Sequence, residues 1–269
     1  MELSKKVGDS IEFIREYAPL ADRYGGGYKV MFSGGKDSQV LLDLFHKAGV
    51  NYRAYYNVTT NDPPENVYFI RKYYKEVTFI HPKHTFLKLI ERKGILPCRG
   101  TRFCCEELKE KSGKGFVAVG VRKEESFVRS KYVPVEFSSK NGKARYFDDK
   151  RMRKNRKVLF RPILEWREDE IWQYIEDNDI PINPCYDIRG RVGCLFCPYA
   201  KKKDLEWNAN HYPLFYRNFM NTIQKMIDNG YFKRFESKEQ VWDWWVSKLS
   251  IDDYFMQKFI EKTQLKLDL

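Results

Sequence analysis

The chain has 269 residues, of which 42% are hydrophobic and 16% aromatic, a composition that excludes an intrinsically disordered protein. Lysine and arginine outnumber aspartate and glutamate by 49 to 37, so the net charge of +12 favours phosphate-rich partners such as nucleotides or nucleic acid. No apolar run approaches the roughly 20 residues that span a bilayer, and the first residues lack a signal-peptide core, so we expect a cytoplasmic protein with no membrane partner.

Short β-rich runs alternate with helix-period runs from about residue 28 to 120. The pattern predicts strands at 28–32, 52–58, 76–80 and 115–120, and helices at 38–48, 65–75 and 84–93. Such alternation is typical of crossover units. We therefore expect an α/β fold, with a parallel twisted sheet and helices on both faces. Ligands of such sheets bind at the carboxyl ends of the strands.

The pattern changes after residue 130. Three short β-rich runs separated by polar loops, at about 131–160, look like an inserted hairpin or loop region. Amphipathic helices are predicted within 167–181, 214–232 and 238–250, the second of them ending at Gly230. We therefore expect a nucleotide-binding domain over 1–200 that includes the clustered cysteines, and a helical extension over 201–269 packed on it.

A glycine-rich segment, SGGKDS, joins the first predicted strand to the first predicted helix and comprises Ser33, Gly34, Gly35, Lys36, Asp37 and Ser38. Glycines let backbone amides approach a ligand, and amides at a helix N-terminus favour an anion. The lysine and the two serines add a charge and hydroxyl donors. We predict a phosphate site, and the alternative is a strand-to-helix turn with polar caps. The segment is neither a Walker A loop nor a dinucleotide fingerprint.

Four of the six cysteines form two pairs, Cys104 with Cys105 and Cys194 with Cys197. Two adjacent cysteines would chelate a single zinc ion through a strained ring, whereas a four-iron cluster offers a separate iron to each thiolate. We therefore favour a [4Fe–4S] cluster over zinc or over buried unliganded thiols. Cys98 lies beside Arg99 and Arg102, a cationic setting that favours the thiolate and suggests a sulfur relay; burial as a small apolar residue is the alternative for both Cys98 and Cys185.

The SGGKDS segment resembles the signature of the PP-loop ATP pyrophosphatase superfamily, whose members cleave ATP between the α and β phosphates and leave an adenylated substrate. The resemblance implies that the loop holds the departing pyrophosphate. It also implies that Lys36 neutralises developing charge and that Asp37 helps to place Mg²⁺, in keeping with chemistry that depends on positioning and electrostatics.

Cys-Cys followed far downstream by Cys-x-x-Cys resembles the phosphoadenosine phosphosulfate (PAPS) reductase family within that superfamily. The segments "GVRKEESFVR", "FRPILEWREDEIWQYIEDNDIPINPCYD" and "GRVGCLFC" agree, so the resemblance covers about residues 28–200. It implies that Lys36, Asp37 and Arg122 are catalytic. The further residues that it implies for the nucleotide site are Thr60, Gly120, Glu125, Ser126 and Arg129.

Two departures from true reductases favour activation of an acceptor over reduction. No cysteine follows Cys197, where reductases carry a nucleophilic cysteine, and the Lys36-Asp37 pair that reductases usually lack is present. An intact loop combined with a cysteine-bound cluster resembles the ATP pyrophosphatases of DNA phosphorothioation and, more distantly, the cluster-dependent tRNA thiolases. This similarity implies ATP as substrate, sulfur transfer to nucleic acid and a sulfur-donor protein such as a cysteine desulfurase. The alternatives are a reductase that uses an external thiol and a nucleotide-binding subunit without turnover.

Two basic runs add a further expectation about partners. The run at 150–157 has six basic residues in eight positions, and Lys201, Lys202 and Lys203 directly follow the last cysteine pair. Either run is a solvated loop or a contact with the phosphate backbone of DNA or RNA. The aromatic run at 241–246 is more typical of helix core than of base stacking.

Overall fold

The computed structural model describes residues 2–110, 113–138, 145–148 and 156–267, and its contacts divide the chain into two compact units. Unit 1 comprises Met1–Val58, Asp62–His81 and Lys111–Val192, and unit 2 comprises Thr59–Asn61, Pro82–Glu110 and Gly193–Leu269. This division differs from the boundary expected at residue 200. The segments 82–110 and 193–200 belong with the C-terminal helices because their apolar side chains, such as Ile90 and Phe196, are buried in the same core.

The sheet of unit 1 has seven strands in the order β3-β2-β1-β4-β7-β5-β6. The strands are β1 (Tyr28–Met31), β2 (Tyr52–Asn57), β3 (Thr78–Ile80), β4 (Gly115–Val119), β5 (Val135–Phe137), β6 (Arg145–Tyr146) and β7 (Lys157–Phe160). The first four and β7 are parallel, whereas β5 is antiparallel to both β6 and β7. The predicted α/β class is confirmed, and the sheet is mixed only at one edge.

Strand β7 corrects one expectation. The sequence pattern assigned residues 131–160 to an insertion, yet β7 pairs in parallel with β4 and is therefore an interior strand of the main sheet. Two of its residues, Val158 and Phe160, are fully buried. The sequence pattern did not place this strand in the main sheet, because β7 has only four residues and follows a polar run instead of a helix-period run.

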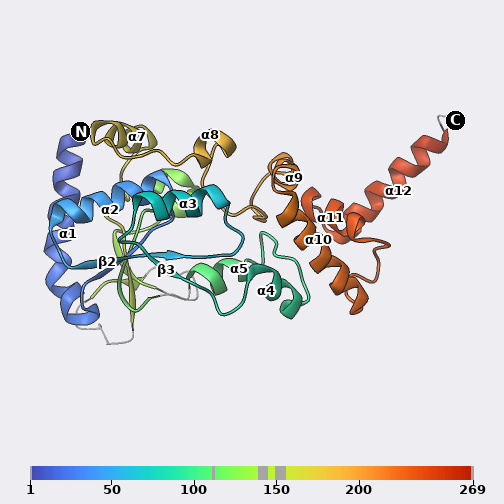
Figure 1. Cartoon of the computed structure of the whole chain (residues 1–269), viewed down its shortest axis with the longest axis horizontal. Coiled ribbons are helices and arrows are strands. Elements are labelled where there is room, and N and C mark those ends of the chain that lie inside the picture. Colours follow the sequence, from blue (N-terminus) through green and yellow to red (C-terminus); the bar gives the residue numbers. More distant parts are fainter. Residues whose placement is uncertain (1, 111–112, 139–144, 149–155, 268–269) are drawn as a thin grey trace. The chain divides into compact units, whose positions relative to one another are not determined.

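The helices of unit 1 are α1 (Leu3–Gly25), α2 (Lys36–Ala48), α3 (Pro64–Tyr73), α6 (Phe127–Ser130), α7 (Glu168–Asp177) and α8 (Cys185–Arg189), with a 3₁₀ turn η2 at Lys123–Glu125. Helices α1 and α2 pack directly on the sheet, and α7 packs on α2 (Figure 1). Helix α1, at the blue end of the chain, was not anticipated. It packs against α2 and β4 with Ile14 and Ala21 buried, and it ends at Gly26, which adopts the left-handed conformation typical of a helix cap.

Unit 2 is built from helices around an aromatic core. They are α4 (Phe86–Lys93), α5 (Phe103–Cys105) with the π-helical turn η1 (Glu106–Glu110), α9 (Lys202–His211), α10 (Pro213–Asp228), α11 (Lys238–Ser247) and α12 (Ile251–Leu267). Phe219 and Trp245 are buried where α10 meets α11, so the aromatic run at 241–246 is indeed core. None of the helices in the described part of the chain has the length and apolar character needed to cross a bilayer.

A buried ion pair joins the antiparallel edge of the sheet to β7. Arg161 donates to the carboxylate of Glu136 on β5 over 2.6 Å and to the carbonyl oxygen of Val133 over 2.7 Å. Arg161 is 3% exposed and Glu136 is 8% exposed. Removing one partner of such a pair leaves the other charge buried.

We therefore expect Arg161→Met to lower the free energy of unfolding by about 3 kcal/mol or more. The control Glu12→Gln removes an exposed pair with Arg15 in the same unit and should change it by about 1 kcal/mol or less. Urea denaturation of both variants measures the difference. Equal stabilities would show that the Arg161 pair contributes no more than a surface pair.

Candidate functional site

The glycine segment forms a tight loop at the carboxyl end of β1, with Gly35 as the N-cap of α2. Gly34 has a φ of +79°, and a Cβ there would lie 2.2 Å from Oδ1 of Asn66. Only glycine fits this position without displacing its neighbour. Since β1 lies between β2 and β4, the loop opens at the strand ends where parallel sheets bind ligands.

Two serines brace the loop from inside. The hydroxyl of Ser38 accepts a hydrogen bond from the backbone N–H of Ser33 over 3.1 Å and donates to the carbonyl oxygen of Gly35 over 2.8 Å. The hydroxyls of Ser33 and Ser38 are also 3.1 Å apart. Ser38 is buried and Ser33 is exposed, so Ser38 shapes the loop and Ser33 faces solvent.

Two buried asparagines, which the sequence analysis did not single out, hold the loop from outside. Asn183 donates from Nδ2 to the carbonyl oxygen of Gly34 over 2.8 Å and to Oδ1 of Asn66 over 2.7 Å. Asn66 in turn donates to the carbonyl oxygen of Ser33 over 3.2 Å. Each asparagine lies within three residues of a proline, a local signal for an ordered polar turn, but their convergence on one loop is a property of the tertiary fold.

Lys36 and its amide are engaged by groups that an anion can replace. The Lys36 ammonium lies 3.1 Å from the Glu168 carboxylate and 3.5 Å from the Asp37 carboxylate. Its backbone N–H donates to the hydroxyl of Tyr186 over 2.8 Å. Burial raises the pKa of Tyr186 to about 12, so this phenol stays neutral. Backbone N–H groups at a helix N-terminus favour an anion, and the carboxylate nearest to Lys36, that of Glu168, belongs to a side chain that is 58% exposed.

Arg122 and Asp37, both predicted from the sequence, are brought together by the fold. Nε of Arg122 lies 2.6 Å from Oδ1 of Asp37, and its guanidinium also lies 2.9 Å from the carboxylate of Glu124. Burial by itself lowers the pKa of Arg122. The negative charge of Asp37 and its hydrogen bond have the opposite and larger effect, so the pKa of Arg122 is raised. Gly120 permits this approach, because a Cβ there would lie 2.8 Å from the carbonyl oxygen of Asp37.

The remaining predicted nucleotide residues have local partners. Glu125 accepts from the backbone N–H of Arg122 over 2.9 Å and pairs with Arg129. Ser126 caps α6 by accepting from the N–H of Arg129. Thr60 belongs to unit 2, where its hydroxyl accepts from the N–H of Phe86 over 2.8 Å. Unit 1 therefore contains the loop together with Gly120, Arg122, Glu125, Ser126 and Arg129, whereas Thr60 and its hydrogen-bond partner Phe86 belong to unit 2.

All four paired cysteines lie in unit 2, and none is in a disulfide. Cys104 and Cys105 share a hydrogen bond that raises the pKa of Cys104 and lowers that of Cys105 to about 6, with Lys109 and Arg102 adding to the second effect. The charge of Cys194 acts on Cys104 as well. One thiolate is therefore favoured in a region where metal ligation needs thiolates.

Asparagines also fix the turn that carries Cys194 and Cys197. Asn61, which is 3% exposed, accepts from the N–H groups of Leu195 and Phe196 over 2.8 and 3.1 Å, and Asn208 donates to the carbonyl oxygen of Leu195 over 2.7 Å. The hydroxyl of Thr59 lies 3.7 Å from Sγ of Cys194. The turn is therefore rigidly supported.

The thiol chemistry of the four cysteines suits a soft metal or an iron–sulfur cluster. In the described ranges, however, no three or more histidine, cysteine, aspartate or glutamate side chains form a group that could hold a metal ion. The remaining two cysteines differ from these four. Cys98 is exposed, whereas Cys185 is fully buried and burial raises its pKa to about 11.

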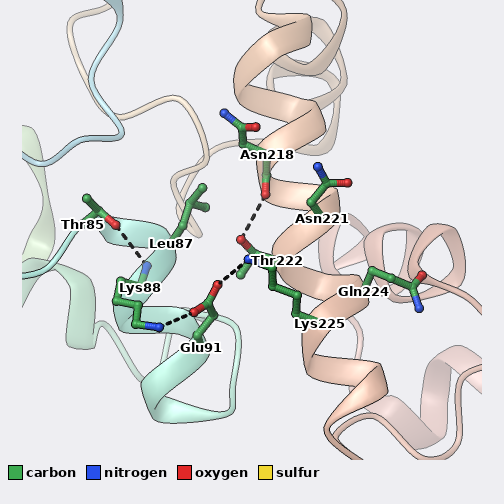
Figure 2. A pocket seen from close by; sticks show the side chains of 9 residues that line it. All are labelled: Thr85, Leu87, Lys88, Glu91, Asn218, Asn221, Thr222, Gln224 and Lys225. Carbon is green, nitrogen blue, oxygen red and sulfur yellow. Dashed lines mark hydrogen bonds and ion pairs between the residues drawn. The ribbon is translucent and has the colours of Figure 1, made fainter.

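A separate groove of about 500 Å³ lies between α4 and α10 in unit 2 (Figure 2). Figure 2 shows Glu91 between Lys88 and Lys225. The carboxylate of Glu91 lies 2.8 Å from Nζ of Lys88 and 3.6 Å from Nζ of Lys225. The groove contains none of the predicted site residues, and both of its lysines are paired with the same carboxylate. Its charge is therefore largely satisfied.

Of the two basic runs, the structure describes the second. Lys201, Lys202 and Lys203 are exposed at the start of α9. Residues 150–155 of the first run lie outside the described residues. Lys202 is within 3.7 Å of Glu206 and 3.8 Å of Asp243, so Lys201 and Lys203 are the better candidates for contact with an external phosphate.

The loop geometry generates a paired prediction. Gly34→Ala should destabilise the protein by about 2 kcal/mol, because an L-residue is strained at this φ and its Cβ meets Asn66, and it should weaken ATP binding. Gly8→Ala, in the middle of α1 with open space around its Cβ, should stabilise by about 0.5–1 kcal/mol. Chemical denaturation and calorimetric ATP titration measure both effects. Equal behaviour of the two variants would contradict the role assigned to Gly34.

The chain is similar in sequence to known proteins. The chain is 27% identical over 237 residues to an uncharacterized protein of Methanocaldococcus jannaschii, which covers 83% of this chain and 53% of that protein, so the chain spans about half the length of this relative. It is 30% identical over 187 residues to the adenosine 5'-phosphosulfate reductase of Oceanobacillus iheyensis, covering 65% of this chain and 72% of that enzyme.

Among solved structures, the FMN adenylyltransferase of Candida glabrata, in complex with FAD and inorganic pyrophosphate, matches with a TM-score of 0.50 and 15% identity. The match covers 77% of this chain and 73% of that one, and it shows that the fold is shared. The model of the phosphoadenosine phosphosulfate reductase domain matches residues 28–200, which is more than half of the chain. The chain therefore belongs to the phosphoadenosine phosphosulfate reductase domain family.

Proposed function

We propose that the chain is an ATP pyrophosphatase that cleaves ATP to AMP and pyrophosphate and adenylates an acceptor oxygen, which sulfur then replaces on nucleic acid. The observation that carries the proposal is the intact Ser33–Ser38 loop at the carboxyl end of β1, with a lysine at the N-terminus of α2 and the Asp37–Arg122 pair beside it. This arrangement supplies positive charge and backbone donors where a leaving pyrophosphate needs them.

In the proposed reaction the acceptor oxygen forms a bond to the α-phosphorus, and the bond to the bridging oxygen breaks. The electron pair of that bond leaves with pyrophosphate. Lys36 exchanges its contacts with Glu168 and Asp37 for phosphate oxygens, and its backbone N–H exchanges the Tyr186 hydroxyl for another. Glu168 has a 58% exposed side chain, so its carboxylate returns readily to solvent.

Asp37 would hold Mg²⁺, because a carboxylate oxygen suits this ion and phosphate oxygens and water complete its shell. When bound, Mg²⁺ neutralises charge on the phosphates. Arg122, nearly buried at 3% exposure, stays charged and orients the Asp37 carboxylate. Together these groups offset much of the negative charge of the triphosphate.

For the second unit we propose a [4Fe–4S] cluster ligated by Cys104, Cys105, Cys194 and Cys197. Four free thiols in one compact unit, one of them with a lowered pKa, support it. When bound, the cluster supplies a redox-active, sulfur-containing centre for the sulfur step. A sulfur-donor protein, such as a cysteine desulfurase, would deliver the sulfur atom.

A second candidate function is sulfonucleotide reduction with an external thiol. The similarity to the Oceanobacillus iheyensis adenosine 5'-phosphosulfate reductase favours it. A non-catalytic nucleotide-binding subunit is the third. Sulfite release from a sulfonucleotide would identify the reductase, and tight ATP binding without product would identify the subunit.

The pyrophosphatase proposal predicts that Lys36→Ala lowers pyrophosphate release from Mg-ATP by on the order of 100-fold or more, because the variant has no ammonium donor for the developing charge. The assay uses anaerobically purified protein with and without DNA or RNA. Lys72→Ala, an exposed lysine on α3 in the same unit, is the matched control and should retain full activity. Release that is indifferent to Lys36 would contradict the assignment.

The proposal of a nucleic-acid partner predicts that the double variant Lys201→Gln, Lys203→Gln binds DNA or RNA more weakly and with less salt dependence. The slope of log K against log salt should fall by about 0.9 for each phosphate of duplex DNA that the variant no longer neutralises. Lys233→Gln with Lys262→Gln, exposed lysines elsewhere in unit 2, is the control. An unchanged slope would exclude Lys201 and Lys203 from the interface.

A further inference from the structure

Helix α9 carries a stripe of exposed side chains. Lys203, Trp207 and His211 follow one another at intervals of four residues, so they lie on one face of the helix. All three are exposed, Trp207 by 40%. On the opposite face, Leu205 is fully buried in the core of unit 2. The stripe therefore faces solvent, while Leu205 attaches the helix to the unit.

The Trp207 ring is ordered by its neighbours although it is exposed. Its centre lies 4.3 Å from the centre of the His211 ring, and the two planes are 15° apart, so the rings are stacked. The buried Tyr212 meets Trp207 edge-on, with the ring centres 6.2 Å apart. A tryptophan ordinarily gains stability from burial, whereas this one is held at the surface by two rings. A flat, ordered ring in solvent is a platform on which a nucleobase can stack.

The lysines at the start of α9 are unfavourably placed with respect to their own helix. Lys201, Lys202 and Lys203 lie at its N-terminus, where the helix dipole disfavours cations, and a single acidic residue, Asp204, accompanies them in the first turn. Of the three lysines, only Lys202 forms an ion pair within the part of the chain that the structure describes. A bound phosphate would offset the remaining charge, because both the lysines and the helix N-terminus favour an anion.

A second exposed ring precedes the lysines in the chain. Tyr199 is 49% exposed, and its hydroxyl donates to the carbonyl oxygen of Arg99 over 3.2 Å. The guanidinium of Arg102 lies 5.2 Å from the centre of the Tyr199 ring. Exposed aromatic and basic residues therefore follow one another along residues 199–211. Aromatic rings combined with positive charge are typical of surfaces that bind single-stranded nucleic acid.

We propose that the surface formed by residues 199–211 binds single-stranded nucleic acid, with an unpaired base stacked on Trp207 and phosphates bound by Lys201 and Lys203. The inference rests on the nucleic-acid acceptor in the proposed function and narrows it, because a base reaches such a ring only when it is not stacked inside a duplex. Trp207 and the three lysines lie beyond residues 28–200, the segment that matches the family. Single-stranded DNA and RNA share the bases and phosphates that this surface would contact, so the test includes both.

The test measures the binding of labelled single-stranded DNA, single-stranded RNA and duplex DNA to the full chain by fluorescence anisotropy. Trp207→Ala should weaken the binding of at least one kind of single strand by about 10-fold, because the stacking of one base is lost, and should leave duplex binding unchanged. The slope of log K against log salt should stay the same, since the substitution removes no charge. Phe259→Ala removes a 68% exposed ring from α12 in the same unit and is the control, with unchanged binding.

Two further variants separate stacking from a structural role of Trp207. Trp207→Phe keeps an aromatic face and should retain most of the affinity for single strands, whereas Trp207→Leu keeps an apolar contact for Tyr212 but offers no ring and should bind as weakly as Trp207→Ala. Thermal unfolding shows that each variant is folded at the temperature of the assay. Equal affinities of Trp207→Phe and Trp207→Leu, or an equal loss of single-strand and duplex binding, would overturn the proposal.

Pyrophosphate release from the same preparations separates this inference from the proposed function. If single strands bind through Trp207 but Lys36-dependent release is absent, the binding surface stands and the pyrophosphatase fails. If release depends on Lys36 but binding is indifferent to Trp207, the pyrophosphatase stands and the surface fails. If the unchanged chain binds no oligonucleotide, the nucleic-acid acceptor and this surface fail together.

Discussion

The conformation of Gly34 is the constraint on which the candidate nucleotide site depends. With φ at +79° the chain turns sharply after β1, and α2 begins directly after Gly35. Asn183 and Asn66 hold the turn by hydrogen bonds to the carbonyl oxygens of Gly34 and Ser33. Both asparagines are buried and donate to backbone oxygens, so their removal would leave unpaired polar groups as well as a loose loop. The loop is therefore pre-organised, which reduces the entropy cost when a phosphate binds.

The charges around this loop form a balanced set. Arg122 is neutralised by Asp37 and Glu124, and Lys36 by Glu168 and Asp37. In the proposed function, a triphosphate binds by exchange of partners instead of by the capture of isolated charges. The partner that is released, Glu168, is largely exposed and can return to water, whereas Arg122 stays buried with Asp37. Exposed carboxylates exchange partners readily and buried ion pairs resist separation, and this difference decides which contacts are permanent.

The cysteine pairs of unit 2 could be recognised in the sequence, whereas the residues that surround them in the structure could not. Their spacing is a local pattern, but the groups that support them come from distant segments: Asn61 follows β2, and Asn208 lies on α9. The same holds for the core of this unit, which combines α4 with helices more than a hundred residues later. A division at residue 200 follows from composition, whereas the actual units follow from which apolar faces bury one another.

The sequence by itself determined the alternating strands and helices, the phosphate loop, its lysine and aspartate, and the two cysteine pairs. These features are encoded by local periodicity and by short motifs whose residues are neighbours in the chain. Tertiary structure alone decided that β7 is an interior strand, that Thr60 serves unit 2, and that Asn66 and Asn183 converge on Gly34. The physical reason is that burial and hydrogen-bond pairing are properties of segments brought together by the fold, and no local pattern records which distant segment supplies the partner.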